Sequence, residues 1–218
     1  MATAARGPGD LRAVIFDLDD TLLVRDRAWQ YAVEEAVISV TGRRVQAAPL
    51  AFEYRNRPWR HALDVVLQPG EDRARCETLC AEMYRRSAMK RLLIHDGLGM
   101  ALDQLRGERV EMGAISREPH AIALKQVQST GLDRFLAVLA ATPAGDPWDV
   151  TARIGACLAF LEREPRACAF VSGDRLDLTA AGAAGLRPFE ATWAANGEAG
   201  LLGIESPAGL TRAILRRS

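Results

Sequence analysis

The chain of 218 residues is short of lysine, because only Lys90 and Lys125 of its 28 basic residues are lysine. It also lacks an excess of either charge, since 28 acidic residues balance the basic ones. Proteins that coat nucleic acid or an anionic membrane need a basic excess to displace counterions. We therefore expect no nucleic-acid partner and no membrane partner, and a site that requires lysine has two candidates.

Long apolar runs and cysteine motifs are missing as well. No segment approaches the roughly 20 apolar residues of a membrane span, and no apolar stretch of the signal-peptide type follows the N-terminal arginines. The four cysteines form no C-x-x-C pair, so neither a structural zinc site nor a disulfide framework is indicated. These features predict a soluble cytoplasmic protein, either a monomer or a homodimer.

Strand and helix patterns alternate along most of the chain. Short apolar runs typical of buried parallel strands lie at 11–16, 110–116, 135–140, 167–171 and 187–191. Helical spacing follows or separates them at 98–105, 119–129, 150–162, 178–184 and 207–216. The alternation predicts an α/β fold with a Rossmann-like three-layer α/β/α core around a parallel sheet.

One long segment has helical spacing throughout. A helix is expected at 27–40, where Thr41-Gly42 ends it, and further helices follow with breaks at Pro58 and at Pro69-Gly70. We therefore divide the chain into a core domain of residues 1–25 and 94–218 and a small all-helical cap domain of residues 26–93.

Acidic residues come directly after two of the predicted strands. Asp17 and Asp19 follow the first strand, Asp174 and Asp177 follow the fourth, and Ser116 ends the second. In open α/β sheets the carboxyl ends of the strands form the ligand-binding edge, so these side chains are expected to meet there. Clustered carboxylates are unfavourable in apolar surroundings unless a cation neutralises them, and oxygen ligands suit Mg²⁺.

These segments resemble motifs of the haloacid dehalogenase (HAD) superfamily. Residues 13–23 (AVIFDLDDTLL) are similar to its first motif, and residues 170–186, with Gly173-Asp174, to its fourth. The strand ending in Ser116-Arg117 fits the second. A helical insert between the first and second motifs is typical of phosphoglycolate-phosphatase-like members. The resemblance covers nearly the whole chain and implies a Mg²⁺-dependent phosphoric monoester hydrolase that acts on a small phosphorylated metabolite.

The resemblance also implies roles for individual residues. Asp17 would attack phosphorus to form an aspartyl-phosphate, and Asp19 would protonate the leaving oxygen and then activate water. Mg²⁺ would bind the carboxylates of Asp17 and Asp174 and the backbone carbonyl of Asp19, with Asp177 as a further ligand or an orienting group. The implied phosphate-binding residues are Ser116 and Arg117. An acid at position 19 favours phosphate over halide chemistry, because a halide needs no proton to leave.

The lysine that forms the third motif of the superfamily is absent. In residues 141–150 the Asp146-Pro147 pair aligns, which leaves Thr142 or Ala144 at the position of the lysine. That lysine would place positive charge where the transition state spreads negative charge. One interpretation is a catalytically weakened protein that acts as a binding or regulatory module. The other is that a cation from elsewhere in the chain replaces the lysine, the candidates being Arg117, Lys125, Arg153 and Arg175.

Basic and aromatic residues of the cap are candidates for substrate contacts. Arg25 and Trp29 directly follow the first motif, and Arg57 and Arg60 belong to a cluster of arginines and aromatic residues. One interpretation is a pocket for a second anionic group of the substrate. The other is a solvated helix face on which the arginine stems cover apolar surface.

Overall fold

The computed structural model describes residues 11–47, 60–194 and 203–215. The chain forms two compact units, one of Met1–Leu22 with Ile94–Ser218 and the other of Leu23–Leu93. The chain thus passes from the first unit to the second after Leu22, three residues before the boundary after residue 25 that the sequence predicts. None of the helices in the described ranges has the length and apolar character needed to cross a membrane.

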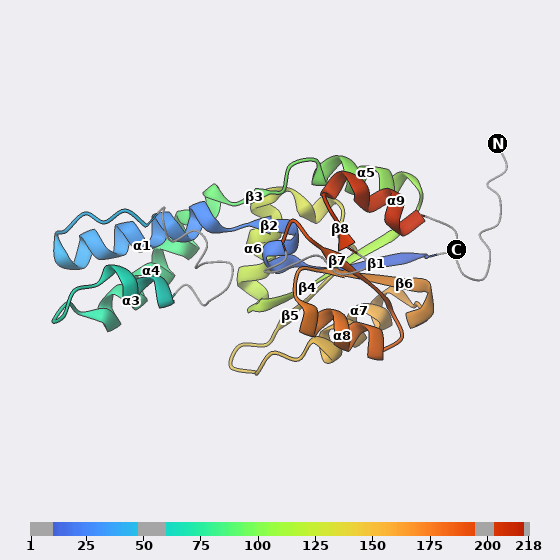
Figure 1. Ribbon diagram of the computed structural model, residues 1–218. Coiled ribbons are helices and arrows are strands. Elements are labelled where there is room, and N and C mark those ends of the chain that lie inside the picture. Colours follow the sequence, from blue (N-terminus) through green and yellow to red (C-terminus); the bar gives the residue numbers. More distant parts are fainter. Residues whose placement is uncertain (1–10, 48–59, 195–202, 216–218) are drawn as a thin grey trace. The chain divides into compact units, whose positions relative to one another are not determined.

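The first unit is built on a parallel sheet of six strands (Figure 1). Its strands are β1 (Ala13–Asp17), β4 (Glu111–Pro119), β5 (Val138–Thr142), β6 (Cys168–Ser172), β7 (Arg187–Ala191) and β8 (Gly203–Ile204). Their order is β5-β4-β1-β6-β7-β8, and every neighbouring pair is parallel. The predicted α/β fold class is therefore confirmed.

Two details of the sheet differ from the expectation. Strand β5 begins at Val138 instead of residue 135, because a 3-10 turn at Leu132–Arg134 leads into Phe135. Strand β8 was not predicted, and with two residues it is too short to have an apolar period.

Helices cover both faces of the sheet. They are α5 (Leu98–Gly107), α6 (His120–Thr130), α7 (Val150–Leu161), α8 (Arg175–Ala183) and α9 (Leu210–Leu215). Helices α7 and α8 pack on one face, whereas α5 and α9 lie on the other (Figure 1). The chain passes from β1 to β4 and β5 on one side and then returns to β6 on the other side of β1. This reversal marks the position at which open α/β sheets bind their ligands.

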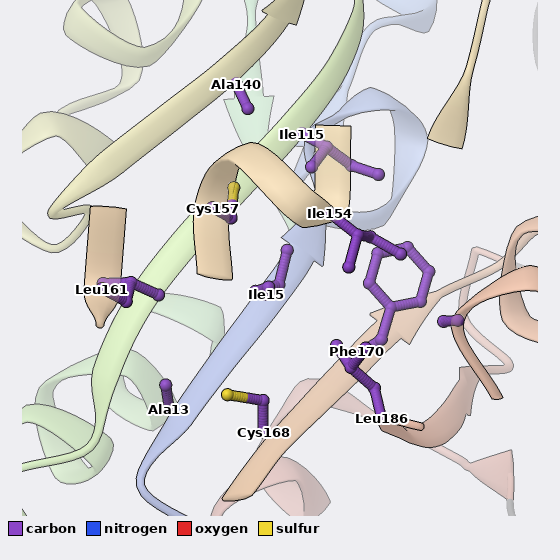
Figure 2. Packing of buried hydrophobic residues seen from close by; sticks show 11 residues of the cluster. Ala13, Ile15, Ile115, Ala140, Ile154, Cys157, Leu161, Cys168, Phe170 and Leu186 are labelled. Atoms are coloured by element: carbon purple, nitrogen blue, oxygen red, sulfur yellow. The ribbon is translucent and has the colours of Figure 1, made fainter. Parts of the chain in front are cut away.

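A closely packed apolar cluster holds β1 beside its neighbours. Ile15 from β1, Phe170 from β6 and Cys157 from α7 are fully buried in it (Figure 2). Burial of a large apolar side chain of this kind stabilises the fold by about 1.5–3 kcal/mol. The cluster thereby fixes the ends of β1, β4 and β6 relative to one another, and those ends carry the polar residues considered below.

The described residues of the second unit form helices, apart from short strands where the chain enters and leaves the unit. Strand β2 (Leu23–Val24) pairs with β3 (Leu93–Ile94). The described helices are α1 (Asp26–Thr41), α3 (Arg60–Val66) and α4 (Arg73–Arg86), followed by a 3-10 turn at Ala88–Arg91. Helix α1 ends at Gly42, whose φ of 72° is readily adopted by glycine, as the sequence predicts.

Trp29 of α1 contributes to the packing of the helical unit. Its ring stacks on that of Tyr84 in α4, with centroids 3.7 Å apart and an interplanar angle of 12°. One face of the indole is therefore covered within the unit itself. This position favours a packing role for Trp29 over the predicted substrate contact.

Gly173, which follows β6, is tightly packed against another segment of backbone. A Cβ atom at this position would lie 2.6 Å from the carbonyl oxygen of Ala194. We expect Gly173→Ala to lower the free energy of unfolding by about 1–3 kcal/mol, because overpacking against backbone forces a shift.

Gly155 in α7 provides the matched control, since nothing lies within 4 Å of a Cβ added there. Gly155→Ala should raise stability by about 0.5–1 kcal/mol through its helix propensity. Urea unfolding of both variants measures the two effects. A Gly173→Ala variant as stable as the parent would contradict the close contact.

Candidate active site

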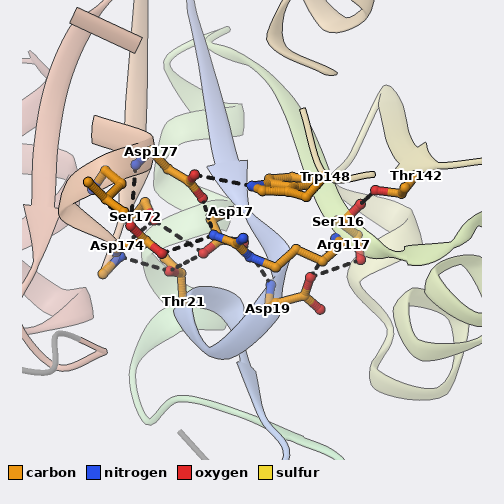
Figure 3. A network of polar contacts seen from close by, with 12 residues as sticks. Asp17, Asp19, Thr21, Ser116, Arg117, Thr142, Trp148, Ser172, Asp174 and Asp177 are labelled. Atoms are coloured by element: carbon orange, nitrogen blue, oxygen red, sulfur yellow. Dashed lines mark hydrogen bonds and ion pairs between the residues drawn. The ribbon is translucent and has the colours of Figure 1, made fainter. Parts of the chain in front are cut away.

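Asp17 lies at the end of the central strand β1 and is only 4% exposed. Its Oδ1 accepts a hydrogen bond from the backbone N–H of Asp19 at 3.1 Å. Its Oδ2 accepts hydrogen bonds from the hydroxyls of Thr21 at 3.3 Å and Ser172 at 3.2 Å (Figure 3). These three donors fix the orientation of the carboxylate.

The two hydroxyl groups on Asp17 are oriented by backbone donors. Thr21 Oγ1 accepts from the N–H of Gly173 at 3.1 Å, and Ser172 Oγ accepts from the N–H of Asp174 at 2.9 Å. A hydroxyl has one proton to donate, so each directs that proton to Asp17. The loop after β1 and the loop after β6 are thus joined through the carboxylate.

Burial raises the pKa of Asp17 well above its ordinary value, and the nearby Asp19 carboxylate raises it further. The guanidinium of Arg117 acts in the opposite direction and lowers this pKa. A buried anion is disfavoured by desolvation and by like charges, and it is favoured by a nearby cation. The charge on Asp17 therefore depends on the positive charge brought to this edge of the sheet.

Asp19 is also buried, with 6% exposure, and its carboxylate is directed to the end of β4. Its Oδ2 accepts from Ser116 Oγ at 3.1 Å and from the backbone N–H of Arg117 at 2.7 Å. Ser116 is fully buried, and its carbonyl oxygen accepts from Thr142 Oγ1 at 3.0 Å. Ser116 thus positions Asp19, while its predicted contact with phosphate stays a prediction.

An irregularity in β4 brings Arg117 to the acidic residues. Ser116 pairs with Ala141 and Pro119 pairs with Thr142, so that the two residues between them are left out of the ladder with β5. Bulges of this kind redirect a side chain at the end of a strand. Arg117 Nη2 reaches Asp174 Oδ2 at 2.9 Å and Asp177 Oδ2 at 2.6 Å.

Trp148 completes this group. The guanidinium carbon of Arg117 lies 4.6 Å from the centroid of the indole, and Trp148 Nε1 donates to Asp177 Oδ1 at 3.2 Å. Burial raises the pKa of Asp177, whereas Arg117 and the hydrogen bond from Trp148 lower it. Arg117 and Trp148 therefore favour the ionised form of a carboxyl that burial disfavours.

Asp174 has two functions at the N-terminus of α8. Its Oδ1 accepts from the backbone N–H groups of Leu176 at 2.8 Å and Asp177 at 3.3 Å. A side-chain oxygen in this position satisfies helix N–H groups that have no partner within the helix. Its Oδ2 is the oxygen that contacts Arg117.

The chemistry of this edge fits Mg²⁺, which binds oxygen ligands and takes as few as one or two carboxylates in a protein site. Asp17, Asp174 and Asp177 supply such oxygens at the ends of β1 and β6. Across the described ranges, no three His, Cys, Asp or Glu side chains are gathered closely enough to hold a metal ion as they stand. Arg117 lies on the Oδ2 atoms of Asp174 and Asp177, and these two carboxylates and that of Asp17 are the ones that would hold the metal.

Neither candidate position for the expected lysine, Thr142 or Ala144, carries a charge, and Thr142 has a structural role. Thr142 ends β5, and its hydroxyl holds the carbonyl of Ser116. Among the candidate replacement cations, Arg175 binds Glu190 at 2.9 Å and Arg153 binds the carbonyl of Ala141 at 2.9 Å. Lys125 lies within α6. Arg117 is the candidate that the structure brings onto the acidic residues.

The other predicted substrate contacts belong to the helical unit and stay predictions. Arg25 precedes α1, and Arg60 begins α3, where its Nε lies 3.5 Å from the carboxylate of Glu77. Arg57 lies outside the described residues.

Three residues of the site were not assigned a role from the sequence. Thr21 and Ser172 stand within the quoted motifs, and the expectation that ligands bind at strand ends could have singled out Ser172. Trp148 had no such signal, because its partners Arg117 and Asp177 are distant in the sequence.

No protein-family model and no curated protein matches this sequence. The structure is similar to a HAD-superfamily hydrolase of subfamily IA, variant 1, from Geobacter sulfurreducens PCA. That likeness has 19% identity and a TM-score of 0.76, and it covers 97% of this chain and 100% of the other. A predicted phosphoglycolate phosphatase from Haemophilus somnus 129pt is similar at 14% identity and a TM-score of 0.75, over 94% and 99% of the two chains.

A further similar structure is that of CbbY from Rhodobacter sphaeroides in complex with phosphate. It has 15% identity and a TM-score of 0.66, over 92% of this chain and 96% of the other. At these identities the likeness concerns the fold. The resemblance carried by the motifs is thereby confirmed for the fold over almost the whole chain.

The raised pKa of Asp17 predicts how an Asp17→Asn variant differs in stability from the parent. In the unfolded chain the pKa of an Asp is about 3.9. When the pKa in the folded chain is higher, the free energy of unfolding falls as pH rises from the unfolded pKa to the folded pKa. The amide does not titrate. The stability of Asp17→Asn relative to the parent should therefore increase with pH across the interval, by about 1.4 kcal/mol for each unit of pKa difference, and then level off.

The measurement is denaturant unfolding of both proteins between pH 4 and pH 9 in the presence of a chelator. Altered hydrogen bonds add an offset that does not change with pH, so the slope is the quantity to compare. A stability difference that is independent of pH would show that Asp17 has an ordinary pKa.

Proposed function

We propose that this chain, which has the fold of the haloacid dehalogenase superfamily, is a Mg²⁺-dependent phosphatase. Its substrate would be a small phosphorylated metabolite, hydrolysed through an aspartyl-phosphate. The observation that carries the proposal is the pair of buried carboxylates after β1, Asp17 and Asp19, each held by hydrogen bonds in a fixed orientation. Two carboxylates in different environments can take the separate roles of nucleophile and acid.

In the first step an oxygen of Asp17 attacks phosphorus. The bond between that oxygen and phosphorus forms as the bond to the leaving oxygen breaks, and Asp19 gives its proton to the leaving oxygen. The hydrogen bonds from Thr21, Ser172 and the N–H of Asp19 hold the nucleophile in place. Positioning of this kind supplies a large part of the rate enhancement in phosphoryl transfer.

In the second step water attacks the phosphorus of the aspartyl-phosphate. Asp19, now ionised, accepts a proton from the water, and the bond between phosphorus and the oxygen of Asp17 breaks. Inorganic phosphate leaves, and both carboxyl groups return to their starting protonation states. Ser116 Oγ and the N–H of Arg117 orient Asp19 for both proton transfers.

A phosphate group can approach Asp17 only if positive charge offsets the repulsion between the two anions. Mg²⁺ held by Asp17, Asp174 and the backbone carbonyl of Asp19 would supply such charge when bound, with Asp177 beside it. Before any metal binds, Arg117 supplies positive charge at the same edge of the sheet. A guanidinium binds phosphate through its fork of donors and thus differs from a lysine in geometry.

A binding or regulatory module is the second candidate function. The observation that favours it is the lack of a charged side chain at either candidate position for the lysine, Thr142 or Ala144; the Thr142 hydroxyl donates to the carbonyl of Ser116 instead. Loss of one preorganised donor commonly lowers a rate by about 10²–10³-fold. In this case the site would bind a phosphorylated ligand without efficient turnover.

Phosphate release from a panel of phosphorylated metabolites, with and without MgCl₂, distinguishes the two functions. For a phosphatase, Asp17→Asn should lower kcat by at least about 10³-fold while the protein stays folded, because the nucleophile is lost. Activity retained by this variant would show that another group is the nucleophile. No turnover by the folded parent on any metabolite would favour the binding module.

Asp19→Asn tests the second carboxylate through its dependence on the leaving group. The leaving group of p-nitrophenyl phosphate needs little protonation. With this substrate we expect a burst that releases about one mole of p-nitrophenol per mole of enzyme, followed by slow turnover. With alkyl phosphates kcat should fall by about 10²–10⁴-fold relative to the parent, and no burst should be seen, because the first step also needs the proton from Asp19. Equal losses on both substrates, with no burst, would contradict the role of Asp19 in both steps.

A further inference from the structure

Arg117 is held at the ends of β1 and β6 by contacts on several sides. Its Nη2 donates to Asp174 and Asp177, its guanidinium lies over the ring of Trp148, and its backbone N–H donates to Asp19 (Figure 3). Its side chain is 40% exposed, so the guanidinium is not enclosed and has room to leave.

In both Asp174 and Asp177, Arg117 binds one carboxylate oxygen, and the other oxygen accepts hydrogen bonds from other groups. Asp174 Oδ1 accepts the N–H groups at the start of α8, and Asp177 Oδ1 accepts Trp148 Nε1. The remaining oxygen of each carboxylate is Oδ2, and Arg117 Nη2 binds both. Asp174 Oδ1 already accepts two N–H groups, so a divalent cation that leaves α8 undisturbed would bind Asp174 through Oδ2, which Arg117 contacts. On Asp177, Oδ2 is likewise the oxygen that leaves the hydrogen bond of Trp148 in place.

We propose that Arg117 is a built-in counter-ion that competes with Mg²⁺ for Asp174 and Asp177, so that metal binding requires its guanidinium to leave. The choice of Mg²⁺ rests on the proposed function, whereas the competition itself needs no substrate and no turnover. In the absence of metal the guanidinium neutralises the carboxylates, and two charge-assisted hydrogen bonds hold it there. Mg²⁺ must therefore overcome these contacts in addition to its own dehydration.

Trp148 stabilises the competing arrangement. Its ring lies beneath the guanidinium, and its N–H holds the carboxylate that the guanidinium binds. A cation over the face of an indole is attracted by the electrons of the ring. The indole is also a reporter, because departure of Arg117 changes the surroundings of one face of the ring.

The test is calorimetric titration of MgCl₂ into the full chain, without substrate, for the parent and for Arg117→Ala. Loss of the charge-assisted hydrogen bonds should tighten Mg²⁺ binding by about tenfold or more. Arg175→Ala is the matched control, since it removes the same charge from the residue next to Asp174, and Arg175 binds Glu190 instead. The tightening in Arg117→Ala should exceed that in the control by about tenfold.

The titrations are made at pH 8, because loss of Arg117 raises the pKa values of Asp17 and Asp177 and protons would compete with the metal at lower pH. Arg117→Gln replaces Arg117→Ala if the alanine variant does not fold. Arg117→Lys keeps the charge but not the fork of donors, so its affinity for Mg²⁺ should lie between those of the parent and Arg117→Ala.

Tryptophan fluorescence gives an independent readout of the same displacement. MgCl₂ should change the emission of the parent, and this change should be lost in Trp148→Phe and reduced in Arg117→Ala. Mg²⁺ affinity in Arg117→Ala no tighter than in Arg175→Ala would overturn the proposal. Tighter binding in a protein without phosphatase activity would leave the competition standing and refute the proposed function alone.

Discussion

The neutralisation of acidic residues at one edge of the sheet is the constraint on which the site depends. Parallel strands end at the same edge, and here β1 and β6 bring Asp17, Asp174 and Asp177 there. Burial raises the pKa of Asp17 and of Asp177, so ionised carboxylates at this place require positive charge nearby. Arg117 supplies it from the irregular end of β4.

The residue that supplies this positive charge comes from a different strand end than in the HAD motifs that the chain resembles. That pattern places a lysine after the third core strand, and the two candidates for that position in this chain, Thr142 and Ala144, are uncharged; the Thr142 hydroxyl donates to the carbonyl of Ser116. The cation comes instead from the residue after Ser116, and it lies on Asp174 and Asp177. The same guanidinium therefore neutralises the carboxylates and occupies oxygens that a metal ion would use. A metal ion that binds there would replace the positive charge of Arg117 with its own.

The fold and the position of the site could be predicted from the sequence because they follow from local patterns. Bounded apolar runs indicated the strands, and the residues directly after them, such as Asp17 and Asp174, indicated the edge. The contacts of Arg117 could not be predicted, since they depend on the register shift between Ser116 and Pro119. Trp148 was missed for a related reason: its partner Asp177 lies 29 residues away, and only the packed sheet brings the two together.

The most direct test of this account is a pair of crystal structures, one of the metal-free protein and one grown with MgCl₂. The account predicts that Arg117 Nη2 bridges Asp174 and Asp177 in the first. In the second, a metal ion lies on the Oδ2 atoms of those carboxylates, and the guanidinium has moved away from them. A metal ion bound there with Arg117 still on both carboxylates would contradict it, as would a metal-free structure in which Arg117 contacts neither.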